Sequence, residues 1–348
     1  MKFLRLAFYV MIAQLVLSGC AGEGVEETSS SSSSEINFDA YVGRNASTRA
    51  GVTNVTSLKG SGFGVFARYN HNGATSPLMD NEHVTWKGNH WGYTNTRYWP
   101  NEGSVDFYAF APYLKNVELV NAPDSIKDNP TCIEFTSSTS PVDLVWDVQK
   151  NKTVPISPTD GKVKFQFKHA LARLGFDITA NQDLEEHGAV IQVEEVKLYG
   201  DTIVNGAFDI KGYLNLENGG WSRHKKNTRV VYTWTPTGAE DGTFKLSASQ
   251  LDHTCPIIEN APNSYLCIIP QEKWQKFYLQ ITYKVQQGTF EEEVKVRKNL
   301  LEVRNPSFPF ERGKAYVFHL ILSLDPIDFN ISATVNEWGP GDDKTMSL

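Results

Sequence analysis

Short stretches in which apolar and polar residues alternate recur along the chain, and turn residues rich in Gly, Pro and Asn separate them. A period of two is that of a β-strand with one buried face. No stretch shows the periodicity of an amphipathic helix of three turns. The pattern therefore predicts an all-β fold of β-sandwiches. We expect strands over residues 36–42, 62–69, 84–86, 91–93, 106–112, 143–146, 162–178, 193–199, 229–234, 264–270, 277–285, 293–297 and 314–324.

The length of the chain and one change in composition predict two domains. At about 100–200 residues per domain, 348 residues suggest two domains in tandem. Residues 150–161 are rich in Pro, Thr, Asn and Lys, as a linker would be. We therefore expect an N-terminal sandwich over residues 36–159 and a C-terminal sandwich over 160–348, with a terminal strand at 327–338.

The N-terminus has the pattern of a targeting signal. Lys2 and Arg5 precede an apolar run over residues 6–17 that is short for a membrane span. The sequence Leu-Ser-Gly-Cys that ends at Cys20 resembles the bacterial lipobox, in which the cysteine becomes the first residue and carries lipid. An ordinary signal peptide with a chance cysteine is the alternative. We expect residues 1–19 to be removed, Cys20 to anchor the protein in the outer membrane, and residues 20–35 to form a flexible Ser-rich tether.

Composition and motifs argue against several classes of function. The chain has 33 Lys and Arg against 40 Asp and Glu, a net charge of −7, which is unlike a nucleic-acid binder. It contains no nucleophile elbow, phosphate-binding loop, His-Glu-x-x-His or Cys-x-x-Cys motif. The glycine-rich residues 60–64 are expected to open a strand, so they lack a helix terminus that would hold phosphate. We therefore predict a protein that is not an enzyme and has no cofactor or metal.

Two groups of residues in the first half are candidates for binding. His71, His83 and His90 match no common metal-ligand spacing, so we expect solvated loop histidines. Trp86, Trp91 and Trp99 could form a stacking platform for sugars. Equally, they could pack in the sandwich core.

Two further features of the sequence, its cysteines and one charged segment, concern structure rather than binding. Cys255 and Cys267 could form a disulfide or remain unpaired, and Cys132 is then a core residue or a free thiol. The charged residues 291–298 place Val294 and Val296 on the other face of their strand, a pattern typical of a protected sheet edge.

The two ends of the expected fold carry similar strands. Residues 36–42 and 327–335 both begin Ile-polar-Phe-polar-aliphatic, so a groove that accepts one strand could accept the other. Arg44 and Arg49 lie in the polar loop after the first strand, where a trypsin-like protease could cut. A cut would remove the first strand, and the matching strand of a second molecule could fill the groove, giving a head-to-tail filament. The alternative is that these are two ordinary edge strands.

A series of motifs, in order along the chain, resembles the fimbrillins, the type V pilin family of Bacteroidales-type Gram-negative bacteria that includes Mfa-like and FimA-like subunits. They are the lipobox at Cys20, the sequences at 36–40, 49–50, 98–100, 105–112, 167–174, 268–271 and 312–316, and Val-Asn-Glu-Trp at 335–338.

The resemblance implies two transthyretin-like β-sandwich domains, export as a lipoprotein, an Arg-specific cut and assembly by donor-strand exchange. By matching position, the cut falls between Arg49 and Ala50, with Arg44 as a rival site. The replaced strand carries Ile36, Phe38, Ala40 and Val42, and the donor strand carries Ile327, Phe329, Ile331, Ala333, Val335 and Trp338.

The predicted function is a structural or adhesive subunit of a fimbrium at the cell surface. Its expected partners are other fimbrial subunits, the outer membrane through Cys20 and a host or glycan ligand. A tip or anchor subunit that is not cleaved is one alternative. A surface glycan-binding lipoprotein that uses Trp86, Trp91 and Trp99 is the other.

Overall fold

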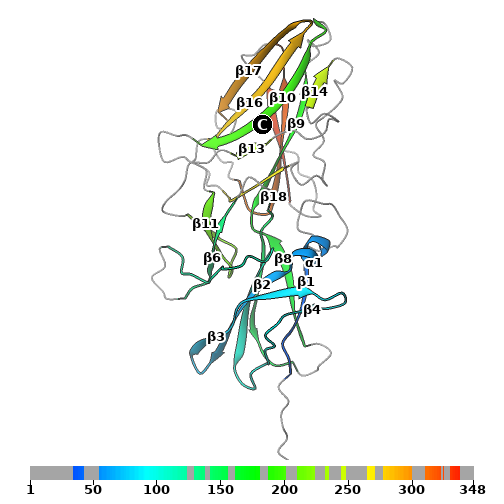
Figure 1. Cartoon of the computed structure of the whole chain (residues 1–348). Coiled ribbons are helices and arrows are strands. Elements are labelled where there is room, and N and C mark those ends of the chain that lie inside the picture. The colour runs from blue at the N-terminus through cyan, green and yellow to red at the C-terminus, as the bar shows by residue number, and fades with distance from the viewer. Residues whose placement is uncertain are drawn as a thin grey trace, which may run out of the picture. The chain divides into compact units, whose positions relative to one another are not determined.

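The prediction of an all-β fold is confirmed by a computed structural model of the chain (Figure 1). Its described part contains nineteen strands and one short helix. The structure describes residues 34–42, 55–123, 129–137, 142–155, 161–180, 187–200, 210–223, 232–234, 244–247, 265–270, 277–299, 310–322, 324 and 330–337.

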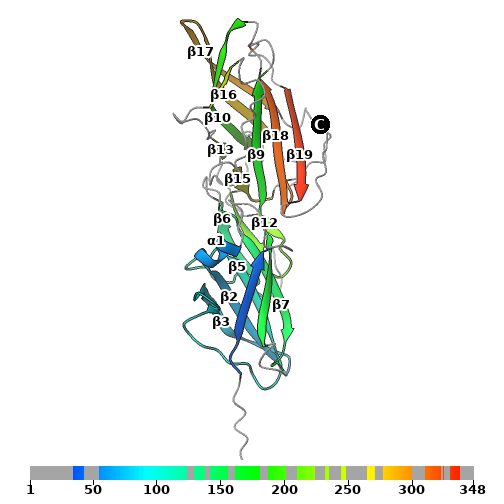
Figure 2. The same ribbon diagram turned by 90° about the vertical axis from the view of Figure 1, so that its right-hand side faces the viewer.

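The first half of the chain forms a seven-stranded sheet with the order β1-β8-β7-β5-β2-β3-β4. The first strand runs parallel to β8, and the other pairs are antiparallel. The two segments β1 and β8 are far apart in sequence but lie side by side in both ribbon views (Figures 1 and 2). The bounds are β1 Asn37–Val42, β2 Phe63–His71, β3 Ala74–Trp86, β4 Trp91–Gly92, β5 Ser104–Ala111, β7 Val145–Lys152 and β8 Lys162–His169.

This sheet has a hydrophobic core on each face. One core is made mostly from residues of the sheet's own strands, including Phe38, Phe63, Phe107 and Phe165. On the other face, residues such as Phe110 pack with a three-stranded sheet, β12-β11-β6. The bounds of these strands are β6 Cys132–Thr136, β11 Lys211–Asn215 and β12 Trp221–Arg223.

The remaining strands among the described residues form two sheets that share another core. A four-stranded sheet has the order β15-β9-β18-β19, and a five-stranded sheet contains β13-β10-β16-β17, with β14 paired to β10. Residues such as Phe176 and Phe318 from the first sheet and Ile191 and Ile281 from the second belong to one buried cluster. The bounds are β9 Ala172–Ala180, β10 Val190–Gly200, β13 Tyr232–Trp234, β14 Phe244–Ser247, β15 Tyr265–Ile268, β16 Phe277–Gln287, β17 Phe290–Asn299, β18 Lys314–Leu322 and β19 Asn330–Glu337.

The structure differs from the sequence predictions in a few elements. The strand expected over 162–178 is two strands, β8 and β9, that belong to different sheets. Four strands of three to five residues, β6, β11, β12 and β14, were not predicted. Helix α1, Val55–Ser61, lies in the expected loop before β2.

The prediction that the glycine-rich residues 60–64 open a strand is correct only for the last part of the segment, because Gly60 and Ser61 end helix α1 and β2 begins at Phe63. Gly62 follows α1 with a φ of 66°, and its N–H donates to the carbonyl of Leu58 at 2.8 Å. This left-handed residue ends the helix and directs the chain into β2.

The expected domain boundary at residues 159/160 stays a prediction. Strand β8 begins after it, yet pairs with β1 and β7. Conversely, β6 precedes the boundary and pairs with β11. Hydrogen bonding therefore links segments from both sides of it.

Candidate functional site

The first strand, β1, contributes directly to a hydrophobic core. Ile36, Phe38 and Ala40 are 0%, 1% and 6% exposed, and Val42 is half-buried against the same cluster. The intervening Asp39 and Tyr41 are exposed. The period of two predicted from the sequence is therefore present, and all four apolar positions of the predicted strand lie on its buried side.

Phe38 lies at the centre of an aromatic cluster. Its ring is stacked on Phe165 of β8, with 5.8 Å between centroids. It also contacts Phe63, Phe107 and Tyr93 at centroid distances of 6.3, 6.0 and 5.4 Å. These partners come from four separate segments, so loss of β1 would expose several of them at once.

Backbone hydrogen bonds hold β1 and the residues before it on two sides. The strand pairs with β8 from Asn37↔Lys162 to Val42↔Phe167. On the other side, Ile36 N–H donates to the Arg97 carbonyl at 2.8 Å, and Trp99 N–H donates to the Ser34 carbonyl at 2.9 Å.

Tyr93 adds a side-chain contact that the sequence analysis missed. Its hydroxyl donates to the Ile36 carbonyl at 2.7 Å. Burial raises the pKa of Tyr93 to about 12, so this phenol stays a neutral donor at physiological pH. No local pattern identifies such a contact, because 57 residues separate the two partners.

β1 is an edge strand, because β8 is its neighbour in the order of the sheet and the series begins with β1. Within the described residues, the chain leaves β1 at Val42 and is next described at Val55. Arg44, Arg49 and Ala50 lie between these points, outside the described residues. Cys20 also lies outside them.

The C-terminal strand β19 is an edge strand too. It pairs antiparallel with β18 in the sheet β15-β9-β18-β19 (Figure 2). Its positions Ile331, Ala333 and Val335 are in register with Leu320, Phe318 and Tyr316, which are buried. The other three expected donor positions, Ile327, Phe329 and Trp338, lie outside the described residues.

The sugar platform expected as one alternative for Trp86, Trp91 and Trp99 is not formed. Trp91 and Trp99 are 3% and 4% exposed and belong to the core, so neither ring can stack on a sugar. Trp86 is half-buried, packs on Trp91 and has Lys59 Nζ 3.9 Å from the centroid of its ring. The alternative of core packing is correct.

The three histidines do not come together, and two of them are strand residues rather than loop residues, because His71 ends β2 and His83 lies in β3. His83 stacks on Tyr113 at 3.8 Å, which corrects the expectation of a solvated side chain. Within the described part of the chain, no group of three or more His, Cys, Asp or Glu residues could hold a metal ion.

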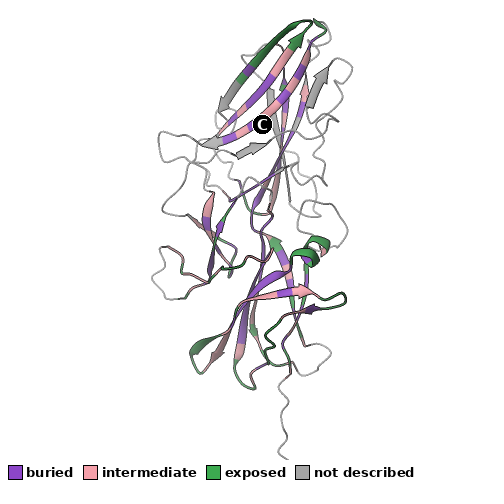
Figure 3. Ribbon diagram, in the orientation of Figure 1, coloured by how far each residue is buried: buried purple, intermediate pink, exposed green. Residues whose placement is uncertain are grey.

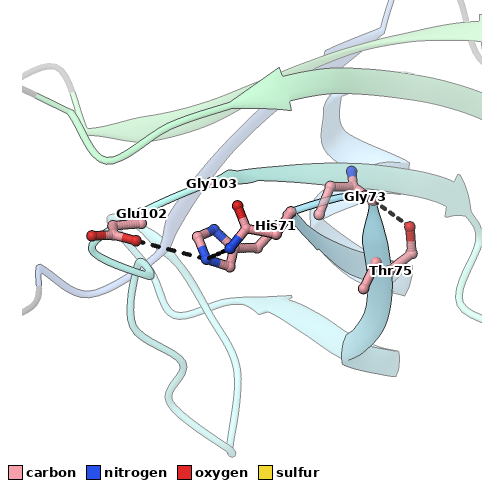
Figure 4. Close-up of a pocket in the computed structure, with 8 residues that line it drawn as sticks. His71, Gly73, Thr75, Glu102 and Gly103 are labelled. Atoms are coloured by element: carbon pink, nitrogen blue, oxygen red, sulfur yellow. Dashed lines mark hydrogen bonds and ion pairs between the residues drawn. The ribbon is translucent and has the colours of Figure 1, made fainter.

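His71 lines an open hollow of about 630 Å³ at the β2–β3 turn (Figure 4). Glu102 points toward it, with 3.7 Å between Nε2 and Oε2. Gly103 is needed here, because it has a φ of 76° and a Cβ would lie 2.4 Å from the Asn70 carbonyl. One histidine and one carboxylate do not complete a metal site, so we assign no function to this hollow.

The cysteine alternatives are decided for the residues that the structure describes. Cys132 and Cys267 are buried and free. Burial raises the pKa of both thiols, most strongly that of Cys267. Cys255 lies outside the described residues, and no disulfide joins Cys267 to it.

Strand β17 forms the edge of its sheet, as its charge pattern predicted. Its acidic residues 291–293 are exposed and Val294 is buried, as Figure 3 shows along the strand. Among the described residues, no helix is long and apolar enough to cross a membrane.

Comparison with known proteins identifies related chains. A family model described as fimbrillin-like matches residues 48–338. The fimbrium subunit Fim1C of Phocaeicola vulgatus is 31% identical over 187 residues, which cover 47% of this chain. The match spans about half of that relative, 48% of its length.

Two solved structures share the fold. A fimbrial protein of Bacteroides vulgatus superimposes with a TM-score of 0.63 and 23% identity, covering 88% of this chain and 99% of that one. A protein of Bacteroides uniformis assigned to cell adhesion gives a TM-score of 0.52 and 18% identity, covering 87% and 99%.

Proposed function

Because the chain belongs to the fimbrillin-like family, we propose that it is a structural subunit of a fimbrium at the bacterial cell surface. In this proposal the chain is exported as an outer membrane lipoprotein through Cys20. A protease then cuts after Arg49 and removes the first strand. The strand at residues 327–338 of a neighbouring subunit takes its place.

The observation that carries the proposal is the burial of β1. Phe38 and Ala40 of this edge strand, and Ile36 just before it, are buried, so removal of the segment leaves an apolar groove. Burying an Ile or Phe side chain contributes about 1.5–3 kcal/mol, and each further methyl group contributes about 0.8 kcal/mol. The burial of these three side chains is worth roughly 4–7 kcal/mol, an upper estimate, and is lost when β1 is removed.

The position of β1 in the chain also supports removal by a protease. Val42 ends the strand, and Val55 is the next described residue, so a cut at Arg49 falls after the whole of β1. Cleavage there leaves the core strands β2, β5, β7 and β8 on one continuous chain. The same holds for a cut at Arg44.

The edge position of β19 supports its role as the donor. It has one partner strand, β18, within the described sheet. Its residues Ile331, Ala333 and Val335 repeat at every second position, as the buried residues of β1 do. Exchange would replace one edge strand by another of matching pattern.

The test compares residues 50–348 with residues 20–348 carrying Cys20→Ala, by size-exclusion chromatography and electron microscopy. We expect filaments from the shorter chain and monomers from the longer one. A peptide of residues 327–338 should bind the shorter chain and block its assembly. The same peptide with Phe329→Asp is the matched control and should not.

Two results would contradict the proposal. If the shorter chain never polymerises, alone or with other fimbrial subunits of the same cell, strand replacement is wrong. If the protein isolated from the cell surface begins with lipidated Cys20 rather than Ala50, it is an anchor subunit or a tethered binder. Arg49→Ala and Arg44→Ala, made separately, identify the residue that is cut.

A further inference from the structure

A second hollow, of about 310 Å³, lies where β7 ends and β8 begins. This volume is at the lower end of the range for small-molecule sites. The hollow is next to the start of β1, because Asn37 is the register partner of Lys162. Its lining residues are Trp99, Gln149, Lys152, Thr153, Pro155, Gly161, Lys162, Val163 and Lys164.

The lining is strongly basic. Lys152, Lys162 and Lys164 all contribute to it, and none of them forms an ion pair with a carboxylate in the part of the chain that the structure describes. Two aspartates flank the hollow. Asp39 of β1 is the register partner of Lys164, and the buried Asp147 accepts from the Gln149 amide at 3.0 Å.

Trp99, one of the residues that line the hollow, carries a hydrogen-bond donor that has no acceptor in the described part of the chain. Trp99 is 4% exposed, and its indole N–H is buried without an acceptor among the described residues. A buried donor that lacks a partner costs about 1–3 kcal/mol. This cost would be recovered if a ligand supplied an oxygen.

We propose that this hollow binds the carboxylate of a ligand of the size of one acidic sugar. Three lysines against two aspartates leave one positive charge, which suits a monoanion better than a phosphate dianion. The indole N–H, the Thr153 hydroxyl and the Gln149 amide can bond the oxygens of a sugar acid. The experiment below uses the uncleaved chain, which retains Asp39 of β1, so its failure and the failure of strand exchange are distinguishable.

The experiment follows the indole N–H resonance of Trp99 by NMR while residues 21–348 are titrated with D-glucuronate. Trp99→Phe, which keeps an aromatic ring, assigns the signal. We expect a saturable shift with glucuronate, none with glucose, and a weaker effect with inorganic phosphate. Lys162→Ala should reduce the affinity about tenfold, as loss of a charged hydrogen bond does.

Three controls make the result decisive. Lys168→Ala changes the same charge on the same strand but lies outside the hollow, so it should bind glucuronate like the parent. A peptide of residues 339–348, which carries two aspartates, tests a carboxylate from a second copy of the chain. Asp160→Asn tests whether the neighbouring Asp160 occupies the site.

Four outcomes of these experiments would overturn the proposal that the hollow binds a sugar acid. They are no saturable shift with glucuronate, binding of the peptide alone, binding that appears only in Asp160→Asn, and an equal loss of affinity in Lys162→Ala and Lys168→Ala.

Discussion

Replacing Phe38 by Ala should open the edge of the seven-stranded sheet. The ring is 1% exposed and contacts four other aromatic rings at 5.4–6.3 Å. Loss of a buried Phe side chain costs about 3–5 kcal/mol. For Phe38→Ala we expect a loss of about 4 kcal/mol, because the neighbouring rings belong to separate segments and cannot all move into the cavity that the substitution leaves.

Hydrogen exchange of the β8 amides measures this change. An opening free energy that is about 4 kcal/mol smaller gives exchange roughly 10³-fold faster, at 1.36 kcal/mol per factor of ten. Tyr41→Ala is the matched control, because it removes an aromatic ring from the same strand where the side chain is 41% exposed. It should accelerate exchange less than about fivefold.

The comparison of Phe38→Ala with Tyr41→Ala tests whether the buried face of β1 stabilises the sheet. If Phe38→Ala and Tyr41→Ala accelerate exchange equally, β1 does not stabilise the sheet through its buried face. The same conclusion follows if Phe38→Ala changes exchange by less than about tenfold. Either result would refute the argument that removal of β1 leaves an apolar groove.

Two further predictions concern the surroundings of β1. Gly62→Ala should lower the free energy of unfolding by about 2–3 kcal/mol, because φ is 66° and a Cβ would lie 2.5 Å from the Val84 carbonyl. Gly73→Ala is the control: its φ is also positive, but the space around it is open, so it should lower the free energy of unfolding by about 1 kcal/mol. Equal urea midpoints for the two variants would contradict this prediction. Tyr93→Phe should lower the free energy of unfolding by about 1 kcal/mol, because it removes the hydrogen bond that the hydroxyl donates to the Ile36 carbonyl. Burial raises the pKa of Tyr93 from 10.0 to about 12, so its contribution is present below pH 10 and is lost as pH rises toward 12. The urea midpoint of the parent should therefore fall more over this range than that of Tyr93→Phe, and parallel curves would show that Tyr93 does not contribute.

The sequence predicted the strands whose pattern is long and regular. Residues 36–42 alternate over the whole strand, and each buried position follows from the direction of successive side chains. The edge strand β17 was likewise predicted from its charges. The short β6 and β11 were missed, because they pair with each other from segments that are far apart in the chain.

The candidate site was predicted only in part. Its apolar residues were found from the alternation in β1. The partners were not found, because Phe165, Phe107 and Tyr93 are brought to Phe38 by pairing between strands far apart in the chain. The tryptophans show the same limit, since burial of Trp91 and Trp99 depends on which face of the sheet they occupy.

By itself, the sequence determined the all-β class and the alternation of β1, because a period of two is a property of neighbouring residues. The tertiary structure decided that β1 pairs parallel with β8, and that Lys162 and Lys164 lie beside Trp99. These arrangements depend on register between distant strands. Register is set by the core as a whole, and no local pattern contains it.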